Sequence, residues 1–185
     1  MSYKLDRMTP DDAPLTVEWM VRQYGFDKHE VETWVKELHF DWPLSVKAID
    51  DNGNAIGLLN MSGYRVEEET NLISTQAPKL LDRINTLNYT AVFSFIVANE
   101  WRGTRLNFDM IMEIMPDMKK DFDFVFIPVM HRLKTHNYWM RWGATEFFRD
   151  NECVYYMLPF TDAAMETARM ASALGQHKAQ TTSPN

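Results

Sequence analysis

Two arginines and a glycine lie where an apolar strand pattern gives way to an apolar helical pattern. Residues 102–107 have the sequence Arg-Gly-Thr-Arg-Leu-Asn, and residues 89–98 before them are mostly apolar. Backbone N–H groups at the start of a helix bind phosphate, and an arginine guanidinium matches phosphate geometry. The segment therefore predicts an anion site for a phosphate-bearing ligand. The alternative interpretation is that Arg102 and Arg105 only solvate the start of a surface helix.

Two side chains near this turn and the following strand are suited to proton transfer. Glu100 precedes Arg102 by two residues, and His131 follows the apolar run 122–130. Carboxylate and imidazole groups can accept a proton, directly or through water. Both residues are candidate general bases. The alternatives are a capping role for the glutamate and a surface or core position for the histidine.

Metal and thiol chemistry are not predicted. Cys153 is the single cysteine, so neither an internal disulfide nor a cysteine-based metal site can form, and we expect it to pack within a strand. The histidines other than His131 lack metal-ligand spacing with nearby acids: His29, His39, His136 and His177. Residues 67–69 are all glutamate, and they either attract a cationic amine or form a solvated loop.

The hydrophobic pattern supplies a scaffold of alternating short strands and helices. Strands are predicted at 3–8, 44–50, 55–64, 89–98, 122–130, 144–149 and 153–160, and helices at 10–24, 27–40, 76–88, from the turn to about 118, and at 131–142. Asn52-Gly53, between two alternating apolar runs, is typical of a hairpin turn. This order predicts an α/β fold with a mixed sheet. Residues 1–160 are expected to form one domain, and residues 161–185 a helix-prone extension with a flexible tail.

In its element order and in this turn, the chain resembles the GCN5-related N-acetyltransferase family over about residues 3–158. The family's turn has the pattern Arg/Gln-x-x-Gly-x-Gly/Ala and follows a strand that ends in Val-x-Pro and an aromatic residue. Arg105 and Asn107 stand where the family has two small residues. Because glycine lets the backbone approach a phosphate closely, two outcomes follow: the turn holds CoA with help from arginine, or it has lost CoA. The residues that fit the family pattern are Val97, Trp101, Arg102 and Gly103.

The resemblance implies a single-domain acyl-CoA N-acyltransferase-like fold, with a mixed, mostly antiparallel sheet flanked by helices and a splayed central strand pair. Pro128 fits such a splay, or equally an edge or a bulge, because proline removes a ladder donor. Acetyl-CoA is the implied co-substrate, with its thioester carbonyl polarised by a backbone N–H at the end of strand 89–98. The residues implied to bind it are Phe95, Ile96, Val97, Arg102, Gly103, Thr104, Arg105, Leu106 and Asn107.

The family often places a tyrosine general acid four residues before a glycine that ends the next helix. Aligned on Gly143, this position holds Trp139, whose indole N–H does not ionise in the relevant range, so Tyr138 is the remaining candidate acid. The implied function is transfer of an acetyl group to a primary amine of a small molecule or peptide. The rivals are a non-catalytic CoA- or ligand-binding module with the same fold and a transferase for another acyl-CoA.

The chain of 185 residues carries a formal charge of −7, which argues against a general nucleic-acid binder. Arg132, Lys134 and Arg141 form either a local basic patch or scattered solvated charge. The N-terminal residues lack the apolar core of a signal peptide, and no apolar run approaches the roughly 20 residues that span a bilayer. We therefore expect a soluble, cytoplasmic protein with no membrane or nucleic-acid partner, and a homodimer is left open.

Overall fold

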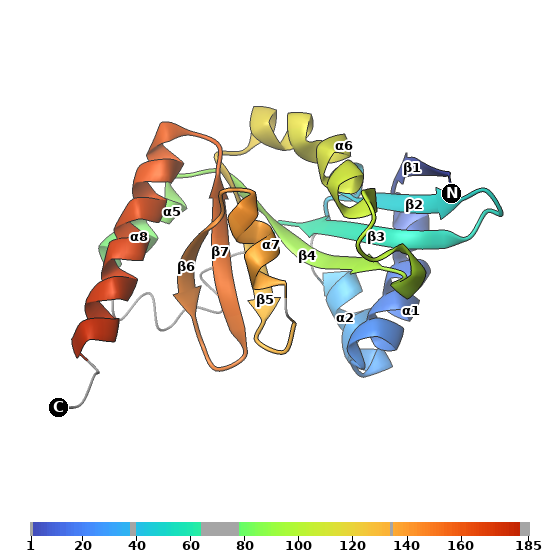
Figure 1. Ribbon diagram of the computed structural model, residues 1–185, viewed down its shortest axis with the longest axis horizontal. Helices are drawn as coiled ribbons and strands as arrows, with labels where there is room; N and C mark the ends of the chain where they lie inside the picture. The colour runs from blue at the N-terminus through green and yellow to red at the C-terminus, as the bar shows by residue number, and fades with distance from the viewer. Residues whose placement is uncertain (1, 38–39, 64–77, 134, 182–185) are drawn as a thin grey trace. The chain divides into compact units, whose positions relative to one another are not determined.

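The structure is a computed structural model that describes residues 2–37, 40–63, 78–133 and 135–181 (Figure 1). The three glutamates at 67–69, together with His39 and Lys134, lie outside the described residues. The chain divides into two compact units, Met1–Tyr64 with Val92–Lys120 and Arg65–Ala91 with Asp121–Asn185. Strand β4 (Tyr89–Val97) begins in the second unit and ends in the first.

The strands form a seven-stranded mixed sheet, which confirms the predicted α/β fold. Their order is β1-β2-β3-β4-β5-β7-β6. Strands β4 and β5 are parallel, whereas the β1–β2, β2–β3, β5–β7 and β6–β7 pairs are antiparallel, so the sheet is mostly antiparallel as predicted. Besides β4, the strands are β1 (Tyr3–Arg7), β2 (Val46–Asp50), β3 (Ala55–Ser62), β5 (Phe124–Met130), β6 (Thr145–Arg149) and β7 (Cys153–Pro159).

The ladder between β4 and β5 is short. It covers three residue pairs, with residues 89–91 opposite residues 124–126, whereas β5 pairs with β7 over seven residues. Pro128 lies in register opposite Tyr155 of β7. The three-residue ladder agrees with the predicted splayed strand pair.

The hairpin of β2 and β3 turns at Asn52-Gly53, as predicted. Gly53 has a φ of 84°, a left-handed conformation that glycine adopts without strain. The carboxylate of Asp50 accepts hydrogen bonds from the N–H groups of Asn52 and Asn54 at 2.9 and 2.8 Å. The turn is closed by its own side chains, so its local sequence is sufficient to predict it.

Helix α1 (Ala13–Tyr24) follows a 3-10 turn, η1 (Pro10–Asp12), and precedes α2 (Lys28–Glu37). The N–H of Thr9 donates to Asp12 Oδ2, and the N–H of Asp12 donates to the Thr9 carbonyl, both at 2.9 Å. The helix predicted over residues 10–24 is therefore confirmed, although its first turn is 3-10 rather than α. Gly25, with a φ of 72°, ends α1 as predicted.

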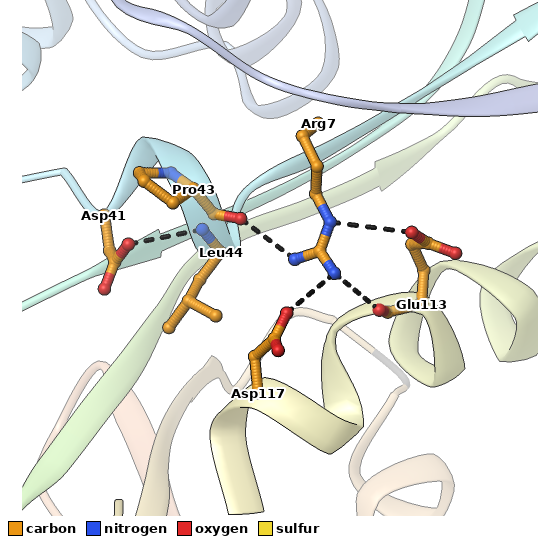
Figure 2. Close-up of polar contacts among 6 residues, drawn as sticks. All are labelled: Arg7, Asp41, Pro43, Leu44, Glu113 and Asp117. Carbon is orange, nitrogen blue, oxygen red and sulfur yellow. Dashed lines mark hydrogen bonds and ion pairs between the residues drawn. The ribbon is translucent and has the colours of Figure 1, made fainter. Parts of the chain in front are cut away.

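Helix α6 (Leu106–Asp121) is tied to β1 by Arg7 (Figure 2). Arg7 Nη2 donates to the Glu113 carbonyl at 2.7 Å and to Asp117 Oδ2 at 2.9 Å. Arg7 Nη1 donates at 2.9 Å to the carbonyl of Pro43, in the 3-10 turn η2 (Trp42–Leu44). Because the guanidinium bonds two elements at once, it fixes the position of α6 on the first unit and hence where the N-terminus of α6 lies.

In the second unit, α8 (Asp162–Thr181) contacts α5 (Pro78–Asn85) and the strands β6 and β7. Ala164, Ala168 and Ala171 are buried, so the inward face of α8 carries small side chains. Most of the extension expected over residues 161–185 is therefore helical, because α8 continues to Thr181. Residues 182–185 of that segment lie outside the described residues.

The helix predicted over residues 131–142 is wrong at its start. Helix α7 covers only His136–Arg141, and residues 131–133 form a turn. The N–H of His131 donates to the Glu152 carbonyl at 2.9 Å, and His131 Nε2 lies 2.9 Å from the Asp150 carbonyl. These contacts tie His131 to the turn between β6 and β7, so it cannot join the helical hydrogen-bond ladder.

Candidate functional site

The turn that carries the two arginines is anchored by Trp101. It begins with η3 (Asn99–Trp101) and ends where α6 starts. The Trp101 ring is buried and meets the Tyr3 ring edge to face, with centroids 5.5 Å apart. The Trp101 carbonyl accepts hydrogen bonds from Thr104 Oγ1 at 2.7 Å and from the Thr104 N–H at 3.3 Å. These contacts hold the turn in one conformation against the core of the first unit.

Gly103 is the turn residue that requires glycine. Its φ is 78°, and no other residue type in the described part of the chain has a positive φ. Arg105 therefore has an ordinary backbone conformation, although the family resemblance places glycine there. Arginine in place of glycine at this position therefore causes no backbone strain, so strain is no argument against phosphate binding by the turn.

Three backbone N–H groups near the start of α6 are available to a ligand. The Leu106 N–H donates to Thr104 Oγ1 at 3.3 Å, and the Asp109 N–H donates to the Arg105 carbonyl at 3.0 Å. Among the residues that the structure describes, the N–H groups of Gly103, Arg105 and Asn107 donate to no acceptor. Such donors at a helix N-terminus can bind an anion.

Both arginines of the turn are exposed, and both already have partners. Arg102 Nε donates to the Val97 carbonyl and Arg102 Nη2 donates to Gln23 Oε1, each at 3.2 Å. Arg105 Nε donates at 2.7 Å to Asp109 Oδ1, and its side chain is 76% exposed. A surface ion pair of this kind is weak, because water screens it and long side chains lose entropy in forming it. Either guanidinium can therefore turn to an anion.

Asp109 links the turn to β1. Tyr3 donates its hydroxyl proton to Asp109 Oδ2 at 2.5 Å. This hydrogen bond, opposed by partial burial and helped by Arg105, lowers the pKa of Asp109 below its usual range. Burial, and then the same hydrogen bond, raises the pKa of Tyr3 to about 12. The charge of Asp109 is thus retained next to the N-terminus of α6, where it competes with any bound anion.

Ile96 and Leu106 serve the core through their side chains. Ile96 is packed in the cluster that contains Trp19 of α1, and Leu106 is fully buried. A Cβ added to Gly57 on β3 would meet Met110 Sδ at 2.9 Å and Leu106 Cδ2 at 3.4 Å. Because α6 packs this closely on β3, Leu106 can offer a ligand only its backbone groups. The backbone groups of Ile96 point towards β3, the edge to which the Ala98 N–H also donates.

Asn107 has an unsatisfied group. Its Oδ1 is buried and has no hydrogen-bond donor among the described residues. A buried amide oxygen without a partner costs free energy, on the order of 1–3 kcal/mol. A ligand that brings an N–H or O–H group to this position would remove that cost.

The last residues of β4 present their carbonyls on the edge away from β3. The Ala98 N–H donates to the Ile56 carbonyl of β3 at 2.9 Å. Because backbone groups alternate along a strand, the carbonyls of Phe95 and Val97 point to the opposite edge. Tyr24 donates its hydroxyl proton to the Phe95 carbonyl at 3.2 Å. Sequence reasoning missed Tyr24, since nothing in the local sequence marks it.

The three candidate proton-transfer residues are divided between the units. Glu100 is exposed in η3 of the first unit, whereas His131 and Tyr138 belong to the second. Tyr138 is half-buried, and burial raises its pKa to about 12, against a smaller lowering effect of the neighbouring Trp142 side chain. Trp139 is only 5% exposed, as expected of a core residue.

No group of three or more histidine, cysteine, aspartate or glutamate side chains is placed to hold a metal ion within the ranges described. In the same ranges, no helix combines the length and apolar character needed to cross a membrane.

No protein-family model matches the chain, and no curated protein matches it either. Solved structures do match. The PaiA N-acetyltransferase of Thermoplasma acidophilum, in complex with coenzyme A, is 12% identical with a TM-score of 0.57, over 86% of this chain and 99% of that one. A GNAT-family acetyltransferase of Listeria monocytogenes is 13% identical with a TM-score of 0.55, over 85% and 94%.

A chain of the NatC complex bound to Gag peptide and CoA is 10% identical with a TM-score of 0.58, over 87% of this chain and all of that one, 100%. At such low identity these likenesses concern the fold alone. The chain has the fold of the GCN5-related N-acetyltransferases.

Proposed function

We propose that the chain is an N-acetyltransferase that uses acetyl-CoA as co-substrate and a primary amine of a small molecule or peptide as acceptor. The observation that carries the proposal is the turn between β4 and α6. There, the N–H groups of Gly103, Arg105 and Asn107 lack acceptors among the described residues, and two exposed arginines flank them. The structural neighbours in complex with coenzyme A support the choice of ligand.

The residues of the turn fit the pyrophosphate of CoA. The N–H groups and the guanidinium of Arg102 or Arg105 would hold it, with the dipole of the 16-residue helix α6 adding to the attraction. Asn107 Oδ1 would gain a partner from an N–H or O–H group of the ligand. When bound, acetyl-CoA supplies an acetyl thioester, which an amine attacks. The N–H of Val97 would stabilise charge that develops on the thioester oxygen.

Glu100 and His131 are proposed to remove a proton from the ammonium group of the acceptor. Glu100 is exposed and can do so through water. A carbonyl only accepts hydrogen bonds, so the contact with Asp150 requires a proton on His131 Nε2. Proton uptake by His131 therefore falls to Nδ1.

Tyr138 is the proposed general acid for the leaving thiolate. With a pKa raised to about 12, its hydroxyl is protonated at neutral pH, as an acid must be. The same pKa makes it a weak proton donor, because the efficiency of an acid falls as its pKa rises above the working pH. A thiolate needs little help to leave, so a slow or absent acid step is compatible with turnover.

Binding of acetyl-CoA tests the proposal first. Thermal unfolding with acetyl-CoA, CoA and desulfo-CoA should show stabilisation that grows with the logarithm of ligand concentration. Arg102→Gln should reduce this shift, whereas Arg22→Gln on α1 is the matched control. Release of free thiol with a panel of primary amines and peptides then measures transfer. No shift at several millimolar ligand would reject acetyl-CoA, and binding without any thiol release would favour a non-catalytic module.

A further inference from the structure

The carbonyls of Phe95 and Val97 are bonded by side chains on the edge of β4 away from β3. The register of β4 with β5 ends at Ala91. Beyond that point, the Tyr24 hydroxyl bonds the Phe95 carbonyl, and Arg102 Nε bonds the Val97 carbonyl, each at 3.2 Å. An open strand edge pairs with any extended chain that carries amides. Each of these side chains therefore uses one lone pair of a carbonyl that an amide-bearing ligand would also use.

The Tyr24 hydroxyl and the Arg102 guanidinium each cover one carbonyl of β4, and we call them caps. They differ in how firmly they are held. The Tyr24 ring meets Phe26 edge to face at 5.6 Å, and Phe26 meets Trp34 in the same way at 5.2 Å. All three rings pack against the buried core of the first unit. Arg102, by contrast, is exposed and held by two long hydrogen bonds. Tyr24 is thus a fixed cap, and Arg102 is a cap that a ligand can displace.

We infer that Tyr24 determines ligand specificity on this edge by keeping the Phe95 carbonyl from the amides of the acyl donor. The inference rests on the proposed function, because it assumes that the arm of CoA, with its two amides, lies along β4. The Tyr24 oxygen is at the distance from the Phe95 carbonyl at which the N–H nitrogen of a paired strand would lie. The Phe95 carbonyl has a second lone pair, but a ligand amide there competes with the Tyr24 hydroxyl. A bound arm therefore bonds the Val97 carbonyl, once Arg102 has moved, in preference to that of Phe95.

The test compares CoA with 3′-phosphoadenosine 5′-diphosphate, written here as ADP, which shares the phosphorylated adenosine and the pyrophosphate of CoA but lacks the arm. Tyr24→Phe keeps the ring and removes the hydroxyl that bonds the Phe95 carbonyl, so a ligand amide no longer competes with it. We expect this variant to bind CoA about threefold to tenfold more tightly in calorimetry, the range of one net hydrogen bond, with ADP affinity unchanged. Tyr3→Phe is the matched control, because it removes a hydroxyl that bonds Asp109 instead of β4. It should leave the ratio of CoA to ADP affinity unchanged.

An unchanged ratio in Tyr24→Phe, with CoA still bound, overturns the inference and leaves the proposed function intact. Absence of CoA binding to the unaltered chain overturns both. A second measurement uses only the unaltered chain, so its outcome does not depend on whether the Tyr24→Phe variant folds. Two CoA analogues, each with one arm amide N–H replaced by an ester oxygen, are titrated into the unaltered chain. At least one should bind as tightly as CoA. Weakening of both by threefold or more would mean that the arm uses both carbonyls, which contradicts the inference.

Discussion

At the scale of single residues, Arg105 and Asp109 decide how strongly the turn attracts an anion. Arg105 replaces a family glycine without backbone strain, yet its guanidinium bonds Asp109 at 2.7 Å. Asp109 stays ionised because Tyr3 and Arg105 lower its pKa, although partial burial opposes them. Its negative charge therefore opposes the dipole-assisted binding of a phosphate at the start of α6.

Asp109→Asn should strengthen CoA binding. The substitution removes a charge of the same sign as the ligand and releases Arg105 for the pyrophosphate. We expect affinity to rise about threefold or more at low salt, and the gain to shrink at high ionic strength, where charges of exposed groups are screened. Calorimetry at low and high salt measures both effects. Asp121→Asn, at the other end of α6, makes the same change of net charge and should leave affinity unaltered. Equal effects of the two substitutions would show that only net charge matters.

At the scale of elements, α6 is positioned by a contact far from the turn. Arg7 bonds Glu113 and Asp117 on α6 and Pro43 in η2, and its side chain is 32% exposed. Arg7→Met keeps the apolar stem but leaves two backbone carbonyls without their donor. The variant should lower the free energy of unfolding by about 1–2 kcal/mol, because charge-assisted bonds that are only partly shielded are worth about that much.

Urea denaturation followed by circular dichroism measures the Arg7 effect. Lys4→Met is the matched control, because Lys4 on β1 forms an exposed ion pair with Asp6. That control should change stability by no more than about 0.5 kcal/mol. A loss in Arg7→Met no larger than the control would contradict a positioning role for Arg7. CoA affinity should fall in Arg7→Met as well, since the N-terminus of α6 depends on the same contacts.

The elements that the sequence predicts well are those closed by local interactions. The Asn52-Gly53 turn, the start of α1 at Thr9 and the end of α1 at Gly25 all depend on neighbouring residues. The start of α7 is different, because His131 is held by a turn about twenty residues later in the chain, at Asp150 and Glu152. Hydrophobic periodicity contains no information on such a contact.

The same distinction applies to the candidate site. Residues 102–107 are contiguous, so their types alone indicate an anion-binding turn. The residues that adjust the turn are remote: Tyr24 bonds Phe95 across 71 positions of sequence, and Tyr3 bonds Asp109 across 106. The roles proposed for Glu100, His131 and Tyr138 stay predictions. Trp139, which aligns with the family's general acid, is buried. The sequence alone does not show whether such a tryptophan lines a ligand site or packs in the core.

At the scale of the whole molecule, the chain and its proposed ligand carry charge of the same sign. The net charge of −7 repels a polyphosphate. At physiological ionic strength, however, the Debye length is only about 8 Å, so distant carboxylates contribute little. Binding therefore depends on groups within that distance of the turn. This is why single substitutions there, rather than the overall charge, are expected to change affinity.

The stability of the whole chain should depend on alkaline pH through tyrosines with a raised pKa, among them Tyr3 in the first unit and Tyr138 in the second. Burial raises the pKa of Tyr3 and of Tyr138 to about 12, from about 10 in an unfolded chain. Between these values the unfolded state releases a proton that the folded state retains. Stability from these groups is thus fully present below about pH 10 and is lost as pH rises towards 12. Denaturation of the unaltered chain, Tyr3→Phe and Tyr138→Phe, at about pH 8 and about pH 11, measures this. The advantage of the unaltered chain over each variant should shrink at the higher pH. An advantage that stays constant or grows would mean that neither hydroxyl resists ionisation in the folded protein.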